Sequence, residues 1–204
     1  MDHIELARQC AERLHDEAVE QGSDPWSPYQ FAKEIAERRG ITVETCVPGA
    51  SILDGARATF DAELLLIVHE NSGTPFEQAF LVAHEVGHAV LGDGEDEDGF
   101  VFQIEPARTS EISPVGIERV VDYSRRQRRE VQMDLFAREL LLPRSRVVEL
   151  HVTRRQTCSE IANRLGAPFD VIAQQMLDAL LLVRQAWRVA RKRNQLGCGG
   201  LAGD

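Results

Sequence analysis

The sequence predicts an α+β fold, in which a small three-stranded sheet packs against two long helices and a helical subdomain follows. Three observations predict this fold. Helical periodicity fills most of the first forty residues, β-rich runs cluster between residues 41 and 69, and helical patterns dominate from residue 74 onward. A length of 204 residues is enough for one domain with a sizeable core.

The chain should begin with two helices. Apolar side chains recur at helical spacing over Ile4–Val19, which predicts an amphipathic helix. A loop follows, and Ser27 with Pro28 is typical of a helix start because proline fits the first helical turn. This second helix should run to about Arg39, where Gly40 ends it as a C-terminal cap.

Three strands are expected next. Residues 41–47 ("ITVETCV") alternate and are rich in β-branched side chains, which indicates a half-buried strand. Residues 56–61 ("ARATFD") and 63–69 ("ELLLIVH") follow as two strands joined by a short turn near Asp61 and Ala62. The last strand is almost continuously apolar, as expected for a strand that is covered on both sides.

Helical patterns resume after the sheet, with one interruption. Residues 93–123 are rich in glycine, acidic residues and serine and read as an insertion, with a short strand at 100–104 and a short helix at 116–123. The expected later helices, in chain order, cover 125–143, 144–151, and two segments within 157–182 that flank the turn "LGAP", the last extending to about 194. Residues 151–195 would form the C-terminal helical subdomain and residues 196–204 a flexible tail.

Composition narrows the class of protein. The net charge is −10, which argues against non-specific nucleic-acid binding by the protein as a whole. The four cysteines are scattered without CxxC spacing, so neither a disulfide framework nor a cysteine-ligated zinc site is expected. The N-terminal helix lacks the apolar core of a signal peptide, and the apolar runs are too short to cross a bilayer. A cytoplasmic protein is therefore predicted.

The stretch "AHEVGHAV" contains the pattern H-E-x-x-H at His84–His88. Thr74 and Pro75 predict that a helix begins before it, and residues four apart share one helical face, so both imidazoles can reach one metal ion. Glu85 is offset by about 100° of helical rotation, where it can act as general base on a water. Chance occurrence on a buried helix is the alternative, because a five-residue pattern is short.

A catalytic zinc site needs a third protein ligand. A third histidine at the metzincin position is excluded, because Leu91 and Gly94 occupy the positions of the glycine and the histidine. Glu130 on the helix 125–143 is the favoured ligand, and Asp134, one turn later, could accept the second N–H of a ligand histidine. The alternatives are an exposed role for Glu130 at the helix start and four other ligands, namely Glu105, Glu111, Glu118 and Glu139.

The sequence resembles the ImmA/IrrE family of zinc-dependent peptidases. The resemblance rests on "AFLVAHEVGHAVLG", on "EVQMDLFARELLLP" as E-x-x-x-D-x-F-A-x-E-L-L-x-P, and on the helical tail "SEIANRLGAPFDVIAQQMLDAL". It implies a metallopeptidase domain over residues 1–150, one zinc ion per chain held by His84, His88 and Glu130, and Glu85 as general base. Leu142 replaces a methionine that often precedes the proline, and the segment 93–129 is longer than in compact members.

The resemblance also implies a partner. Members of the family cleave or inactivate a helix-turn-helix repressor in phage, mobile-element or stress-response circuits, so limited proteolysis of one protein is expected. Substrate backbone would add to the exposed sheet edge near residues 63–69. Tyr123, His69 and His151 are candidate transition-state stabilisers, and each has a structural role as its alternative.

Two other functions compete with proteolysis. One is a zinc-stabilised anti-repressor that sequesters its partner without cutting it, although such a protein needs no general base at Glu85. The other is a DNA-associated regulator, or the peptidase module of a larger DNA-associated protein, because residues 159–180 have the cadence of a helix-turn-helix. The presumed second helix has no lysine or arginine for phosphates or bases, so direct nucleic-acid binding is disfavoured.

Overall fold

The computed structural model describes residues 3–92 and 124–181 of the chain. Its helices are α1 (His3–Glu20), α2 (Pro28–Arg38), α3 (Pro75–Leu91), α4 (Arg125–Leu141), α5 (Arg144–Val148), the π-helical turn η2 (Glu149–Thr153), α6 (Cys158–Leu165) and a further helix over 169–181. Its strands are β1 (Thr42–Cys46), β2 (Ala58–Asp61) and β3 (Leu66–Glu70), with the 3-10 helix η1 (Ser51–Leu53) after β1. The predicted α+β class with a three-stranded sheet is confirmed.

The sheet has the order β1-β3-β2. β1 pairs with β3 in parallel, and β2 pairs with β3 antiparallel. The strand expected over residues 63–69 is therefore central and has no free edge, so the expected docking of substrate along it is wrong. The strand order could not be read from the sequence, and it makes β1 and β2 the two edges.

The turn before β3 is longer than the sequence pattern suggested. Residues 63–65 belong to the turn, and β3 begins at Leu66. The Asp61 carboxylate accepts hydrogen bonds from the backbone N–H groups of Glu63 and Leu64, both at 2.9 Å. An aspartate that binds nearby backbone donors favours a turn over an extended ladder, which explains the later start of the strand.

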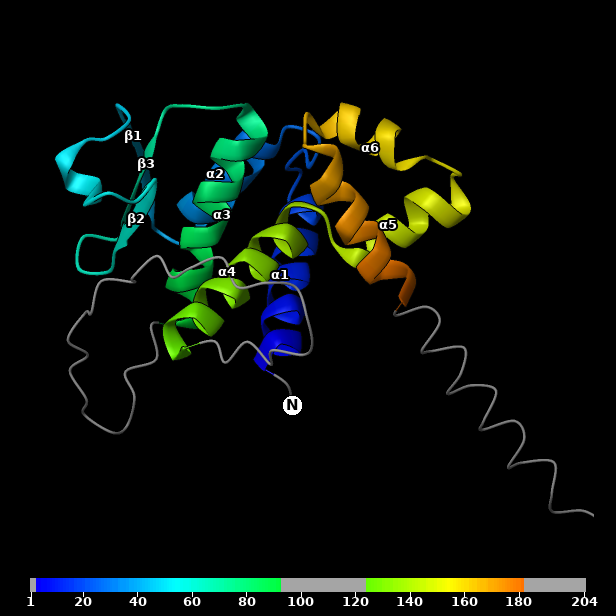
Figure 1. Cartoon of the computed structure of the whole chain (residues 1–204), viewed down its shortest axis with the longest axis horizontal. Coiled ribbons are helices and arrows are strands. Elements are labelled where there is room, and N and C mark those ends of the chain that lie inside the picture. Colours follow the sequence, from blue (N-terminus) through cyan, green and yellow to red (C-terminus); the bar gives the residue numbers. More distant parts are fainter. Residues whose placement is uncertain (1–2, 93–123, 182–204) are drawn as a thin grey trace, which may run out of the picture.

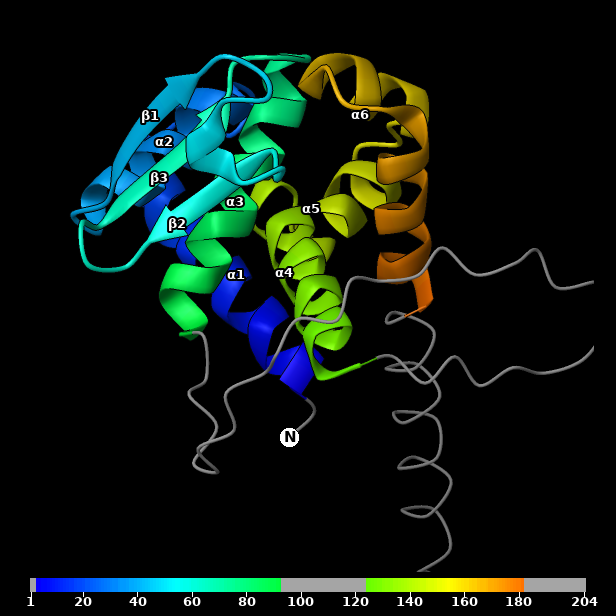
Figure 2. The same cartoon turned by 60° about the vertical axis from the view of Figure 1, so that its left-hand side comes forward.

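The helices form layers on one side of the sheet. α2 packs against β1 and α3, while α3 packs against β2 and β3 (Figure 1). α4 packs against both α3 and α1, so it forms the next layer away from the sheet (Figure 2). The largest fully buried side chains include Phe31, Ile67, Val82, Met133, Phe136, Leu140 and Leu150. The core therefore extends from the sheet through α3 and α4, the two helices that carry the predicted ligands.

Both of these helices begin with a capping box, which fixes where each one starts. At α3 the N–H of Glu77 donates to Thr74 Oγ1 and the N–H of Thr74 donates to the Glu77 carboxylate. At α4 Ser124 and Gln127 make the same reciprocal pair. Such boxes satisfy N–H groups that a helix start leaves without intrahelical partners. The start of α3 predicted from Thr74 and Pro75 is confirmed.

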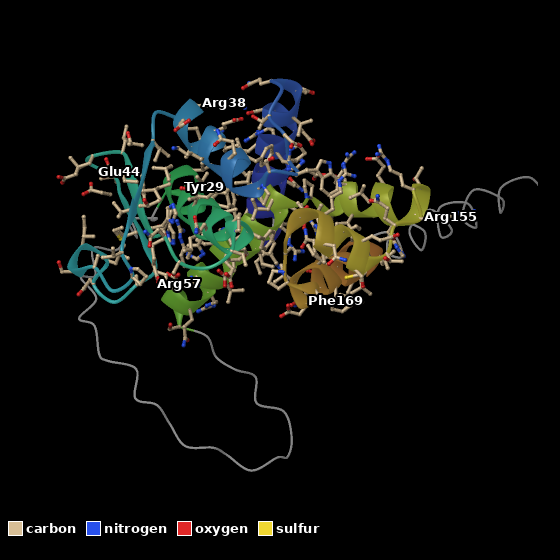
Figure 3. The ribbon with its side chains drawn as sticks, turned by 90° about the horizontal axis from the view of Figure 1, so that it is seen from above. Tyr29, Arg38, Glu44, Arg57, Arg155 and Phe169 are labelled. Carbon is tan, nitrogen blue, oxygen red and sulfur yellow. The ribbon has the colours of Figure 1, made fainter. Side chains whose placement is uncertain are left out.

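The C-terminal helices pack at the end of the molecule away from the sheet. Figure 3 shows Arg155 and Phe169 at this end, with Glu44 and Arg57 of the sheet region at the other. The helix expected over 144–151 is divided into α5 and η2, and the capping box of Thr157 and Glu160 starts α6 as predicted. The elements predicted for 93–123 and beyond 181 lie outside the described residues. Among the helices that are described, none combines the length and apolar character that a membrane span requires.

Candidate metal centre

Three of the predicted ligands converge where α3 meets α4. His84 and His88 of α3 and Glu130 of α4 each offer one ligand atom, and these atoms lie within 4.8 Å of one another. The two histidines share a face because they are four residues apart on one helix. Glu130 comes from the first turns of α4, which packs directly against α3. The structure thus brings together side chains that lie more than forty residues apart.

The spacing of the ligand atoms fits a tetrahedral metal ion. The Nε2 atoms of His84 and His88 are 3.3 Å apart, and His84 Nε2 is 3.3 Å from Glu130 Oε2. Zinc binds nitrogen and oxygen at about 2.0–2.2 Å, so neighbouring ligand atoms of a tetrahedral site lie roughly 3.3–3.6 Å apart. Both distances agree with this value, and the ligand atoms of all three residues lie within 4.8 Å of one another.

Asp134 fixes the orientation of the first histidine. His84 Nδ1 donates its proton to Asp134 Oδ1 at 3.0 Å, which leaves a lone pair on Nε2 of the neutral ring. That lone pair faces the Glu130 carboxylate, which is also an acceptor. Two acceptors 3.3 Å apart attract a cation or a proton between them. The arrangement is the one in which a carboxylate orients a metal-binding histidine.

Electrostatics at His84 favour positive charge. Burial alone would lower the pKa of His84, but the hydrogen bond that His84 donates to Asp134 and the charges of Glu85, Asp134 and Glu130 outweigh it, so the pKa is raised above its ordinary value. The same carboxylates that hold a proton on the ring would hold a metal ion in its place. Metal and protons therefore compete for this group.

Glu85 lies beside this cluster and outside the set of three ligand atoms. Its side chain is buried, with 9% of its surface exposed, although it is ionisable. Its negative charge is one of the causes that raise the pKa of His84, after the hydrogen bond to Asp134. A carboxylate that is adjacent to the ligands and largely shielded from water has the placement of a general base.

Gly87 sets the distance between the two ligand helices. A Cβ atom at this position would lie 3.0 Å from Met133 Sδ and 3.0 Å from a ring carbon of Phe136, closer than ordinary contact. Both of these side chains are fully buried on α4. The absence of a side chain at Gly87 lets α4 approach α3 closely enough for Glu130 to reach the histidines.

Glu139, one of the alternative ligands, is committed elsewhere. Its carboxylate is 1% exposed and accepts hydrogen bonds from the backbone N–H and Nε of Arg144 and from Gln175 Nε2. Arg144 in turn reaches Glu5 of α1 at 3.2 Å. This buried cluster ties the end of α4 to α1, α5 and the helix 169–181, so Glu139 has a structural role. Glu105, Glu111 and Glu118 lie outside the described residues.

The candidate transition-state stabilisers are not assembled at the centre by the described part of the chain. His69 is fully buried in β3, where Nδ1 donates to the backbone oxygen of Glu70 and Nε2 accepts from the Tyr29 hydroxyl at 3.0 Å. His151 donates from Nδ1 to the backbone oxygen of Gln156 in the C-terminal helices. These bonds give both histidines structural roles. Tyr123 lies outside the described residues.

His15 is a histidine that the sequence reading did not single out. It is 4% exposed and donates from Nδ1 to the backbone oxygen of Leu140, 125 residues away, at 2.8 Å. The available signal was a lone histidine on the apolar face formed by Ala11, Leu14 and Ala18 of α1. A histidine on an apolar face has no motif, so only the packing of α1 against α4 reveals its contact.

The chain was compared with known proteins. A model of the IrrE N-terminal-like domain, Peptidase_M78, matches residues 36–177, which include both ligand helices and most of the C-terminal helices. A comparison with curated proteins gave no match. The matched region contains all of the residues that converge at the candidate metal centre.

Proposed function

The chain belongs to the family of the IrrE N-terminal-like domain (Peptidase_M78), and we propose that it is a zinc-dependent endopeptidase that cleaves a regulatory protein of the helix-turn-helix repressor type. Its setting would be a phage, mobile-element or stress-response circuit. The observation that carries the proposal is the convergence of His84, His88 and Glu130 with ligand atoms at tetrahedral spacing, beside the shielded carboxylate of Glu85.

His84, His88 and Glu130 would hold the ion, with Asp134 orienting His84. Two imidazoles and one carboxylate form a ligand set that zinc accepts in peptidases, with a fourth position left for water or substrate. A bound zinc ion supplies Lewis acidity, which makes a water acidic near neutral pH and polarises a carbonyl group. The exposed fraction of the Glu130 side chain is 49%, so substrate has a route to the centre.

Glu85 would move the proton in this reaction. It accepts a proton from the attacking water and passes it to the nitrogen of the leaving amine, so that one carboxylate serves both steps. Glu85 follows His84 in the sequence and is not one of the three ligand residues, which supports this role. Shielding from solvent keeps the proton on the path between the water and the amine.

The substrate backbone would bind along β2. This strand is an edge of the sheet and packs beside α3, whereas β1 lies on the far side of β3 (Figures 1 and 2). The Glu70 N–H donates to Arg57 O, so alternation along the ladder turns the backbone groups of Ala58 and Phe60 towards the free edge. An extended peptide can add to such an edge by main-chain hydrogen bonds.

The negative net charge of the chain supports a basic protein as its substrate. The net charge of the chain is −10, and a protein that binds DNA through a helix-turn-helix presents lysine and arginine to phosphates. Opposite charges accelerate association and favour the correct partner over acidic proteins. The acidic balance of this chain therefore suits capture of a DNA-binding protein that is not engaged with DNA.

The test is incubation of the zinc-loaded protein with helix-turn-helix proteins encoded beside its gene, followed by mass spectrometry. We expect discrete fragments of one partner with the wild type. Glu85→Gln should retain one zinc per chain and lose cleavage by at least 10²-fold, the usual contribution of a general base. Glu63→Gln, in the exposed turn before β3, is the matched control and should cleave normally.

Cleavage that is undiminished in Glu85→Gln would exclude the proposed mechanism. A stable complex with an intact partner would instead show sequestration without proteolysis. Fragments that persist in excess chelator would point to a contaminating protease, so the chelator control belongs in each experiment.

A further inference from the structure

A second site lies at the other end of α4 from the metal centre. A pocket of about 260 Å³ opens between α1, the loop that precedes α2, and the start of α5 and η2. Figure 1 shows α1 beside α4, whose C-terminal end leads into α5. Val19 and Pro25 contribute apolar surface to the pocket, and His15, Asp16, Arg146 and Glu149 contribute polar groups. None of these residues takes part in the proposed peptidase reaction.

His15 gives this pocket a hydrogen-bond acceptor. Its Nδ1 carries a proton, because the partner is the backbone oxygen of Leu140, which can only accept. Burial lowers the pKa of His15 and keeps the ring neutral, so Nε2 bears a lone pair. Within residues 3–92 and 124–181, Nε2 has no hydrogen-bond partner, and the ring forms part of the pocket wall.

The charged side chains of the pocket differ in whether they have an ion-pair partner. Arg146 is paired with Glu149, which also binds Arg154 at 2.6 Å, so this carboxylate is shared between two guanidinium groups. Asp16 has no ion-pair partner in the part of the chain that the structure describes, and it lines the same pocket. Among the charged side chains that line the pocket, Asp16 is therefore the one without an ion-pair partner in the described residues, and His15 adds an acceptor at Nε2.

We propose that this pocket binds a small organic cation, an alkylammonium or alkylguanidinium ion. Its N–H groups would donate to His15 Nε2 and the Asp16 carboxylate, and its alkyl chain would pack against Val19 and Pro25. The volume of about 260 Å³ is slightly below the roughly 300–1,000 Å³ of sites for drug-sized ligands, which suits a ligand of this size. A hydrogen bond in which both partners are charged is shorter and stronger than a neutral one, so Asp16 favours a cation over a neutral alcohol.

The test is a titration with agmatine, which has a guanidinium group and an ammonium group at the two ends of a four-carbon chain. Trp26 borders a smaller adjoining pocket that shares His15, Pro25 and Arg146, so its fluorescence reports on the site. The chain has two tryptophans, and Trp187→Phe leaves Trp26 as the single emitter. We expect a saturable change with agmatine and none with butyrate, which has a similar alkyl chain and the opposite charge.

Two variants locate the binding. Asp16→Asn should weaken agmatine binding about tenfold, because a charge-assisted hydrogen bond becomes a neutral one. His15→Asn keeps an N–H for Leu140 and removes the acceptor at Nε2, so it should also weaken binding. Glu44→Gln on β1, at the opposite end of the molecule (Figure 3), is the matched charge control and should bind as the wild type does.

Several outcomes would overturn the proposal. They are a signal that does not saturate, equal weakening by Glu44→Gln and Asp16→Asn, or binding of butyrate as tight as that of agmatine. Binding of Nα-acetyl-arginine amide as tight as that of agmatine would assign the pocket to an arginine side chain of a protein partner and exclude a free cation. If His15→Asn does not fold, the agmatine affinities of Asp16→Asn and Glu44→Gln still decide whether the pocket binds the cation. Neither zinc nor cleavage enters the measurement, so its result is independent of the proposed peptidase activity.

Discussion

Two histidines each donate a hydrogen bond from Nδ1 to α4, and their pKa values are shifted in opposite directions. His84 donates from Nδ1 to Asp134 near the start of α4, and His15 donates from Nδ1 to the backbone oxygen of Leu140 near its end. The pKa of His84 is raised, because three carboxylates act on it more strongly than burial does. The pKa of His15 is lowered, because burial dominates over its hydrogen bond and the nearby charges.

The difference shows that a shared hydrogen bond does not determine what a histidine can bind. In both rings the Nδ1 bond leaves Nε2 as the second nitrogen, which carries a lone pair when the ring is neutral. At His84 that lone pair faces another imidazole and a carboxylate, so a metal ion satisfies all three acceptors. At His15 the lone pair belongs to a buried, neutral ring that lines a pocket with both apolar and charged side chains, where a ligand that donates a hydrogen bond is the better match.

The largest expected effect is the stabilisation of the fold by zinc. A ligand at 1,000 times its Kd stabilises the state that binds it by about 4 kcal/mol. His84→Asn should remove this increase, because it removes a ligand. His15→Asn should keep the increase while lowering the stability of the metal-free protein. Urea unfolding with and without zinc measures the stabilisation by zinc and the stability of the metal-free protein. The proposed difference between the two histidines is contradicted if both variants lose the stabilisation by zinc equally.

A smaller effect is expected from Asp134. Asp134→Ala leaves the three ligands in place but no longer orients His84, so zinc affinity should fall roughly 10- to 100-fold. Competition with a chromophoric chelator gives the affinity. Glu44→Ala, which removes one carboxylate far from the centre, is the control for the general loss of negative charge. An affinity that falls equally in both variants would mean that Asp134 acts only through net charge.

The next effect concerns the spacing of the helices at the His84 end. Gly87→Ala adds a Cβ that meets Met133 and Phe136 at 3.0 Å, and overpacking of this kind typically costs about 1–3 kcal/mol. Better helix propensity returns about 1 kcal/mol, so a net loss of roughly 0–2 kcal/mol is expected. Zinc affinity should fall as α4 moves away from α3. An unchanged affinity, measured by the same chelator competition, would show that Gly87 does not set the ligand distance.

The sequence could predict the ligand cluster around His84 because the geometry within each helix is local. Two histidines four apart on a helix share a face whatever the fold, and Glu130 with Asp134 repeats the same spacing on α4. The packing of α4 on α3 followed from the apolar faces of both helices, but its closeness depends on Gly87 meeting Met133 and Phe136.

The contacts at the C-terminal end of α4, where His15 binds, are not encoded in the spacing of residues along the sequence. His15 and Leu140 are 125 residues apart, and no pattern around either residue indicates their hydrogen bond. The order β1-β3-β2 was likewise beyond the reach of strand patterns, because alternation gives the faces of a strand and not its neighbours. The late start of β3 followed from the Asp61 side chain, which binds two backbone N–H groups that a longer strand would have used.

The smallest effect is a pH dependence that His15 adds to stability. Burial holds the pKa of His15 below its ordinary value of 6.5 in the folded protein. The unfolded chain therefore binds more protons than the folded protein as the pH falls below 6.5, and the free energy of unfolding decreases on acidification. This contribution is fully present above pH 6.5 and is lost as the pH falls through the folded pKa.

His15→Asn isolates the effect, because its amide can donate to Leu140 O in place of Nδ1 and does not titrate. The wild type should lose more stability than His15→Asn between pH 7.5 and pH 5.5, measured by urea unfolding in zinc-free buffer. Every other ionisable group is present in both proteins, so the contributions of those groups cancel in the difference. Equal slopes in the two proteins would mean that His15 takes up a proton as easily when folded as when unfolded. The neutral acceptor on which the second site depends would then be absent below pH 6.5.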